Sequence, residues 1–172
     1  MTATFEPFPR TLNTRANLRS VAADLAVGAA LAPLLDGHRW SAVLDLHGPD
    51  RHWPEREARL GALAQHGPVL RMAFDDATPI DAGVFSMARA VYRARRAQGP
   101  MLVCCFAGRS RSASVAAALL ALEGGLAWEE AVRRVSLYDA RGKLLHAPHP
   151  VSLDSARAWV QARHPSPSAF AR

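Results

Sequence analysis

Cysteine is scarce in this chain of 172 residues: Cys104 and Cys105 are the only two, and they are neighbours. Adjacent residues of a strand point to opposite faces, and their Cα atoms lie closer together than an unstrained disulfide prefers. Two cysteines also supply too few ligands for a cysteine-based zinc site. The composition therefore excludes a disulfide framework, and the thiols themselves have to account for any function of these residues.

Long apolar runs are lacking as well. No stretch approaches the roughly 20 residues that a membrane helix needs, and residues 1–10 lack the apolar core of a signal peptide. We therefore expect no membrane span and a cytoplasmic location.

Lysine is nearly absent, since Lys143 is the only one, yet the formal net charge is +6. Arginine carries almost all of the positive charge, and its scattered positions are typical of solvated helix faces. A basic surface attracts anions such as phosphoproteins, phospholipid headgroups and RNA. We expect an anionic partner other than nucleic acid. Abundant alanine and arginine with so little lysine indicate a GC-rich bacterial genome.

The length fits one domain, and no internal repeat is visible in the sequence. We assign residues 1–20 to an N-terminal arm, 21–163 to the domain and 164–172 to a flexible tail. Strand patterns alternate with helix patterns, which predicts an α/β fold with a central, mostly parallel sheet of about four or five strands flanked by helices. The expected strands are Asp24–Val27, Trp40–Leu46, Val69–Phe74 and Met101–Cys104. The expected helices are Ala29–Leu35, Pro54–Gln65, a helix from Ile80 that stops near Gly99, and then Arg111–Leu122, Trp128–Leu137 and Ser152–Ala162.

The run from Met101 to Ser112 joins an apolar strand, a cysteine, a turn with a glycine, an arginine and an alanine-rich helix without a gap. A turn between a strand and a helix N-terminus directs backbone N–H groups and a positive dipole end at one point, which binds anions. The same field stabilises a thiolate at Cys105, and Arg111 supplies a planar fork for two phosphate oxygens. The Ser112 hydroxyl is placed to donate to the Cys105 sulfur. Cys104 is interpreted as a core residue, with redox pairing to Cys105 as the alternative.

The leaving group of a phosphate ester needs a proton, so a carboxylic acid has to reach this loop. The strands Val69–Phe74 and Met101–Cys104 bracket one helix, and parallel strands joined in this way end on the same edge of a sheet. Asp75 and Asp76 follow the first of these strands. We predict Asp75 as the general acid and keep Asp76 as the alternative. A turn or a helix cap is the competing role for either aspartate.

The segment from Cys104 to Ser112 resembles the signature of the protein tyrosine phosphatase superfamily, in its compact dual-specificity branch. The usual form of that signature is His-Cys-x-x-Gly-x-x-Arg followed by Ser or Thr. The resemblance places the acid on a loop about thirty residues before the cysteine, as Asp75 is. Cys104 stands where the family has histidine, which removes one support of the thiolate. The catalytic residues are then Cys105, Arg111, Asp75 and Ser112, and the substrate-binding loop consists of Phe106, Ala107, Gly108, Arg109 and Ser110, with no metal and no other cofactor.

We therefore predict a metal-independent phosphatase that hydrolyses phosphate monoesters of proteins, on tyrosine, serine or threonine, through a phosphocysteine intermediate. One alternative is a phosphoinositide or RNA 5′-phosphatase, which the basic charge permits and for which Arg109 would add charge. Another is a phosphate-binding pseudophosphatase, motivated by the missing histidine. We interpret His146 and His149 as parts of a solvated loop, and residues 50–53 as the pocket rim or a plain surface turn.

Overall fold

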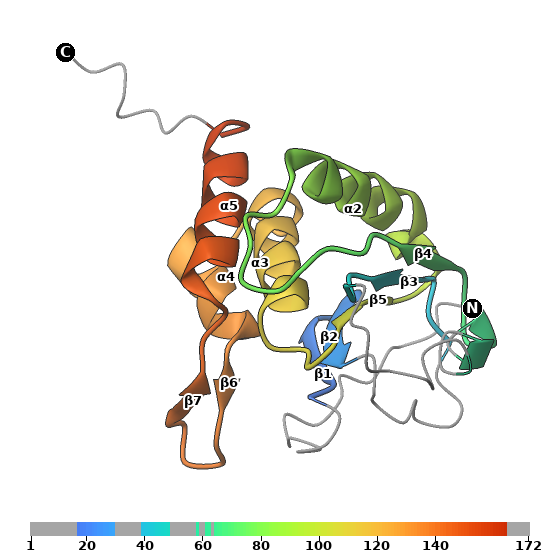
Figure 1. Ribbon diagram of the computed structural model, residues 1–172, viewed down its shortest axis with the longest axis horizontal. Helices are drawn as coiled ribbons and strands as arrows, with labels where there is room; N and C mark the ends of the chain where they lie inside the picture. Colours follow the sequence, from blue (N-terminus) through green and yellow to red (C-terminus); the bar gives the residue numbers. More distant parts are fainter. Residues whose placement is uncertain (1–16, 30–38, 49–57, 59–60, 63, 165–172) are drawn as a thin grey trace.

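The computed structural model describes residues 17–29, 39–48, 58, 61–62 and 64–164, and within them five strands form one sheet in the order β1-β2-β5-β3-β4 (Figure 1). β1 at the edge is antiparallel to β2, whereas the pairs β2–β5, β5–β3 and β3–β4 are parallel. The predicted α/β fold with a mostly parallel sheet is thus confirmed. The strands are β1 (Arg19–Ala22), β2 (Leu25–Ala29), β3 (Ala42–Asp45), β4 (Val69–Arg71) and β5 (Met101–Cys105).

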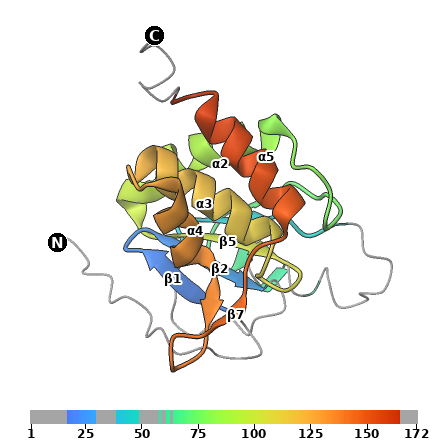
Figure 2. The same ribbon diagram turned by 90° about the vertical axis from the view of Figure 1, so that its left-hand side faces the viewer.

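Helices α2, α3, α4 and α5 cover one face of this sheet (Figure 2). α3 lies at the centre, against β2 and β5 on one side and against α4 and α5 on the other. Nearly every residue of α3 is buried, and the alanines along it let its neighbours approach closely. The helices are α2 (Ala82–Arg95), α3 (Arg111–Glu123), α4 (Trp128–Val135) and α5 (Pro150–Gln161), and a short 3-10 helix, η1 (Arg96–Gln98), follows α2.

Local chemistry sets several of these boundaries. α2 begins at Ala82 because the carboxylate of Asp81 accepts a hydrogen bond from the N–H of Gly83, at 2.6 Å, and so caps the helix. Pro150 occupies the first turn of α5, where its missing N–H costs no helical hydrogen bond. The last four predicted helices are confirmed to within a few residues, as α2, α3, α4 and α5.

An antiparallel hairpin between α4 and α5 was not predicted. It consists of β6 (Leu137–Tyr138) and β7 (Leu144–His146), and it projects away from the helices (Figure 1). The Asp139 carboxylate closes its turn by accepting the N–H groups of Arg141 and Lys143, at 2.9 and 2.8 Å. α4 therefore ends at Val135, two residues before the predicted end, because the chain turns there into β6.

β1 starts at Arg19, so the last residues of the predicted arm belong to the sheet. Residues 1–16 of that arm, the predicted tail beyond residue 164 and residues 50–53 lie outside the described residues, as do almost all of Ala29–Leu35 and most of Pro54–Gln65. Within the described ranges, no helix is long and apolar enough to cross a membrane. The core fills the space between the sheet and the helices, and its largest fully buried side chains include Phe85, Leu25, Leu44, Leu46, Met101, Leu102 and Leu119.

Candidate active site

Cys105 is the last residue of β5 and lies at the carboxyl edge of the parallel strands, where the chain enters loop 106–110 and then α3. The strand is held on both sides, by β2 and by β3, and the thiol is buried. The Cys105 Sγ lies 3.2 Å from the Ser112 Oγ. The first turn of a helix leaves N–H groups without intrahelical partners, so the start of α3 presents a positive end beside this sulfur.

Arg111 is the first residue of α3 and is only 3% exposed. Its Nη1 donates to the carbonyl oxygen of Phe74 at 2.7 Å and more weakly to that of Leu46 at 3.4 Å, so the guanidinium is fixed by the segments that follow β4 and β3. Its Nε is buried and finds no hydrogen-bond acceptor among the residues that the structure describes. An oriented guanidinium with a remaining N–H suits a bound oxyanion.

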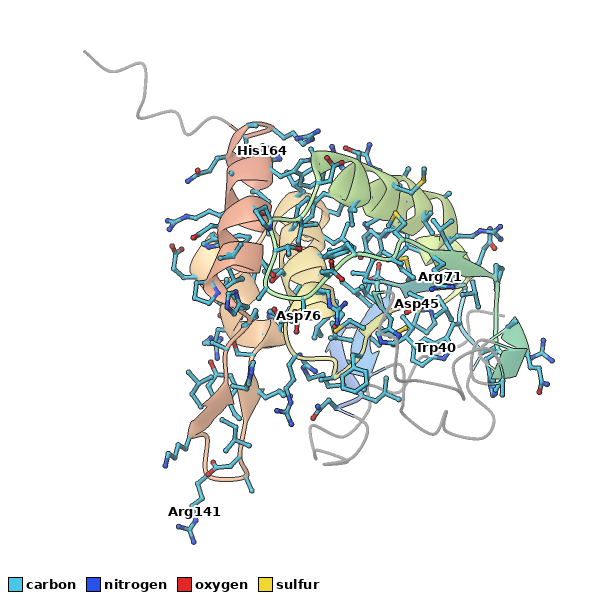
Figure 3. All side chains as sticks on the ribbon, viewed as in Figure 1. Trp40, Asp45, Arg71, Asp76, Arg141 and His164 are labelled. Atoms are coloured by element: carbon cyan, nitrogen blue, oxygen red, sulfur yellow. The ribbon has the colours of Figure 1, made fainter. Side chains whose placement is uncertain are left out.

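The two candidate acids, Asp75 and Asp76, differ in the contacts that their carboxylates make. The Asp76 carboxylate lies 3.5 Å from the Nε of Arg111, and Figure 3 shows it beside the start of α3. Asp75 is exposed, and its carboxylate forms no ion pair within the described part of the chain; its backbone carbonyl accepts the Thr78 hydroxyl at 2.8 Å. Asp81, rather than either of them, caps α2. Asp76 is exposed as well, at 60%, and the oxygen that faces Arg111 also accepts the N–H of Ala77 at 3.0 Å. Of the two carboxylates, only that of Asp76 contacts Arg111 among the described residues.

Asn17 lies just before β1 and Arg19 is the first residue of β1. Both hold loop 106–110, called here the phosphate loop, from the side of β1. The Asn17 side-chain amide donates to the carbonyl of Ala107 at 2.6 Å, and the Arg19 Nη1 donates to the carbonyl of Gly108 at 2.9 Å. In a planar peptide the C=O and N–H groups point in opposite directions. Because the carbonyls of Ala107 and Gly108 point toward β1, the N–H groups of the same peptide units, those of Gly108 and Arg109, point away from β1.

Arg19 is also a charged group at the back of the site. Burial lowers its pKa to about 10, an effect that the negative charge of Cys105 opposes, so the guanidinium stays cationic at neutral pH. A second nitrogen of the same guanidinium donates to the carbonyl of Val135, at the end of α4. Arg19 thus ties the loop, β1 and α4 together. Sequence reasoning missed Asn17 and Arg19, because a pair separated by 90 residues leaves no signal in a single sequence.

Gly108 lets the loop lie directly against β2. Its φ is +66°, and a Cβ built there would lie 2.5 Å from the carbonyl carbon of Gly28 and 2.6 Å from the nitrogen of Ala29. Both the left-handed backbone and the lack of space require glycine at this position. Of the other predicted loop residues, Phe106 and Arg109 are exposed at the rim, and Phe106 stacks on His47.

Cys104 points away from the site, as the alternation along a strand predicts. Its Sγ lies 4.0 Å from the Asp45 carboxylate. Burial, and then the negative charges of Asp45 and Cys105, raise the pKa of the Cys104 thiol well above its ordinary value. Both cysteines are free. Cys104 is accordingly a neutral core residue and contributes no positive charge where a histidine would.

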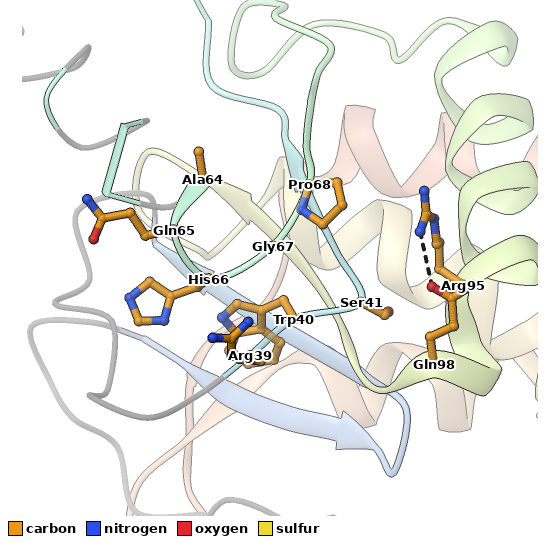
Figure 4. Close-up of a pocket in the computed structure, with 10 residues that line it drawn as sticks. All are labelled: Arg39, Trp40, Ser41, Ala64, Gln65, His66, Gly67, Pro68, Arg95 and Gln98. Carbon is orange, nitrogen blue, oxygen red and sulfur yellow. Dashed lines mark hydrogen bonds between the residues drawn. The ribbon is translucent and has the colours of Figure 1, made fainter.

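A separate polar pocket opens at the opposite edge of the sheet (Figure 4). Trp40 and Ser41 precede β3 and Pro68 precedes β4, so this pocket lies at the amino ends of the strands, away from Cys105. Its lining residues are Arg39, Trp40, Ser41, Ala64, Gln65, His66, Gly67, Pro68, Arg95 and Gln98.

Comparison with solved structures shows which known proteins share this fold. The sequence matches no protein-family model and no curated protein. Among solved structures, human DUSP28 is similar with a TM-score of 0.62 and 23% identity over 86% of this chain and 95% of that chain. P. aeruginosa TpbA has a TM-score of 0.58 and 21% identity over 94% and 91%. PTPMT1 in complex with PI(5)P has a TM-score of 0.59 and 19% identity over 85% and 97%. The fold is that of the dual-specificity and protein tyrosine phosphatases, as the sequence resemblance implied.

Proposed function

We propose that this protein is a cysteine-dependent phosphatase that hydrolyses phosphate monoesters through a phosphocysteine intermediate. One observation carries the proposal: a thiol, a buried guanidinium and a carboxylate converge from three separate segments. Cys105 comes from β5, Arg111 from α3 and Asp76 from the connection between β4 and α2. The shared phosphatase fold supports the same conclusion.

In the first step the Cys105 thiolate attacks phosphorus in line with the ester oxygen. The S–P bond forms while the P–O bond to the leaving group breaks. The Arg111 guanidinium and the N–H groups of loop 106–110 hold the three remaining phosphoryl oxygens. Asp76 donates its proton to the departing oxygen, so the alcohol or phenol leaves neutral.

In the second step water attacks phosphorus, and the S–P bond breaks. Asp76, now a carboxylate, takes a proton from that water, and inorganic phosphate leaves the loop. The Ser112 hydroxyl, 3.2 Å from the sulfur, donates to the thiolate as it departs. The thiolate and the protonated acid are thereby restored, and every proton is accounted for without a further reactant.

Asp76 takes the acid role in this proposal, in place of Asp75, because its carboxylate faces Arg111. A group that protonates the leaving oxygen has to reach the phosphate that Arg111 holds, so geometry decides between two neighbours of equal chemistry. Both aspartates are exposed, and the contact with Arg111 is what distinguishes Asp76 from Asp75.

For the substrate we propose phosphotyrosine and phosphoserine or phosphothreonine in proteins. An inositol phosphate is the second candidate, because one protein of similar fold was solved with PI(5)P and because Arg109 is exposed at the rim of the loop. Competition between phosphotyrosine peptides and soluble inositol phosphates for hydrolysis of an aryl phosphate separates the two.

The deciding experiment measures hydrolysis of aryl phosphates between about pH 5 and 8 in the presence of a chelator. We expect Cys105→Ser to abolish turnover and Asp76→Asn to lower kcat by roughly 10²- to 10⁴-fold, with a larger loss for a phenyl than for a p-nitrophenyl ester. The poorer leaving group depends more on the proton.

Asp75→Asn is the matched control, since it removes the same charge one residue away. A larger loss in Asp75→Asn than in Asp76→Asn would return the acid role to Asp75. Folded wild-type protein that binds vanadate but turns over no ester would favour the pseudophosphatase alternative.

A further inference from the structure

Two of the exposed large apolar side chains of the described residues, Leu144 and Leu145, follow each other on the β6–β7 hairpin. Leu144 and Leu145 on β7 are 49% and 56% exposed, and Phe106 in the phosphate loop is 42% exposed. Met87, on the outer surface of α2, is exposed to a similar degree, 48%, but stands alone. Two adjacent exposed leucines on a projecting strand are costly in water, so an apolar contact elsewhere would stabilise them.

The hairpin (residues 137–146) is fastened to the phosphate loop at both of its ends. On the side of β6, the Arg19 guanidinium bridges the carbonyl of Val135 and that of Gly108. On the side of β7, the N–H of His149 donates to the Ser110 hydroxyl at 3.2 Å. The segments on either side of the hairpin are therefore anchored to the loop that follows Cys105.

The surroundings of the leucines are cationic. Arg141 and Lys143 are exposed in the turn of the hairpin, and Arg141 points away from the protein at its far end (Figure 3). The carboxylate of Asp139 faces the backbone N–H groups of the turn instead of either cation. No acidic residue occurs between positions 140 and 149, so no further carboxylate of this segment offsets the positive charge.

We propose that the hairpin docks this protein on an anionic lipid surface, with the Leu144 and Leu145 side chains at the boundary of the acyl chains and Arg141 and Lys143 among the headgroups. Apolar side chains flanked by cations are the general requirement for contact with such a surface. The hairpin is convex, whereas a peptide is recognised in a groove or along a longer strand edge, so a planar partner fits better.

This inference goes beyond the proposed function, because it concerns where the protein acts and not which bond it cleaves. It requires no membrane-spanning segment.

The test is co-sedimentation of the full chain, as the Cys105→Ser variant, with vesicles of phosphatidylcholine alone or mixed with phosphatidylglycerol. We expect binding to the mixed vesicles only, weakened by salt. Arg141→Glu with Lys143→Glu should lower the partition coefficient by roughly fivefold or more for each cation. Leu144→Ser with Leu145→Ser should lower it by about tenfold or more.

Met87→Ser is the matched control, since it removes an equally exposed apolar side chain from another surface, and it should bind as Cys105→Ser does. Thermal unfolding verifies that each variant folds. Absence of binding to anionic vesicles, or equal binding by the Leu144/Leu145 variant, overturns the proposal. Binding of an acidic peptide in place of vesicles would assign the hairpin to a protein partner and overturn it as well. Because vesicle binding is measured without turnover, its outcome does not depend on whether the protein is a phosphatase.

Discussion

At the scale of single residues, the site has a positive charge that the sequence motif does not contain. The position before the nucleophile is Cys104, a buried neutral thiol, so the support that a histidine gives elsewhere is missing. Arg19 reaches the back of the same loop from β1, where it holds the Gly108 carbonyl. Its guanidinium stabilises a negative charge at Cys105 and also fixes the loop amides, and we infer that it compensates for the histidine.

This role predicts a charge-dependent defect in Arg19→Met. We expect the rate of Cys105 alkylation by iodoacetamide at neutral pH to fall, because a cation near the sulfur is lost. Arg19→Lys keeps the charge but loses the planar guanidinium, so it should retain most of the alkylation rate. If both variants were alkylated at the wild-type rate, Arg19 would only hold the loop in place.

At the scale of elements, the contact between the phosphate loop and β2 fixes where the loop amides lie. The loop backbone at Gly108 is in van der Waals contact with the backbone of β2 at Gly28 and Ala29, with no space for a side chain between them. Such backbone contact is rigid, because neither β2 nor the start of α3 can move without disturbing the buried core. The position of the anion site therefore depends on β2 as much as on the loop sequence.

Gly108→Ala should therefore destabilise the protein more than the backbone angle alone explains. Gly125 has the same φ of +66° but open space around it, so Gly125→Ala is the matched control. We expect Gly125→Ala to lower the free energy of unfolding by roughly 1–2 kcal/mol. Gly108→Ala should cost about 1–3 kcal/mol more because of the overlap. Urea denaturation measures both, and equal losses would contradict close loop–β2 packing.

At the scale of the whole molecule, the site joins β1, β5, α3 and the connection from β4 to α2, so a bound oxyanion links segments from most of the fold. Such a ligand binds the folded state and not the unfolded chain. Orthovanadate at about 100 times its dissociation constant should stabilise the protein by about 2.7 kcal/mol, which raises Tm by roughly 5–10 °C. Differential scanning fluorimetry measures this shift.

Arg111→Lys should reduce the stabilisation by vanadate, because a lysine lacks the planar fork. Arg133→Lys on the outer face of α4 provides the control with the same substitution at an exposed site. If vanadate raised the Tm of Arg111→Lys as much as that of the wild type, Arg111 would not be a ligand of the anion.

Much of the fold follows from local patterns. The strand that ends at Cys105, the turn after it and the buried helix from Arg111 were predictable, because strand and helix periodicities depend on residues close together in the chain. The hairpin β6–β7 was missed: each of its strands is only two or three residues long, too short for a periodic signal. Its Asp139–Gly142 turn was the available clue.

The sequence by itself was enough to predict Cys105 and Arg111 as candidate site residues and the edge of the sheet on which Asp75 and Asp76 lie. These predictions depend on covalent order and on the rule that connected parallel strands end together. Only the tertiary structure shows the contacts of these residues. The contact of Asp76 with Arg111 depends on the direction of one side chain in a loop, and adjacent residues of the same type give no local signal for it. The contact of Arg19 with Gly108 spans 89 residues and forms only when β1 pairs with β2 beside β5. Such long-range contacts are set by packing, which no short stretch of sequence encodes alone.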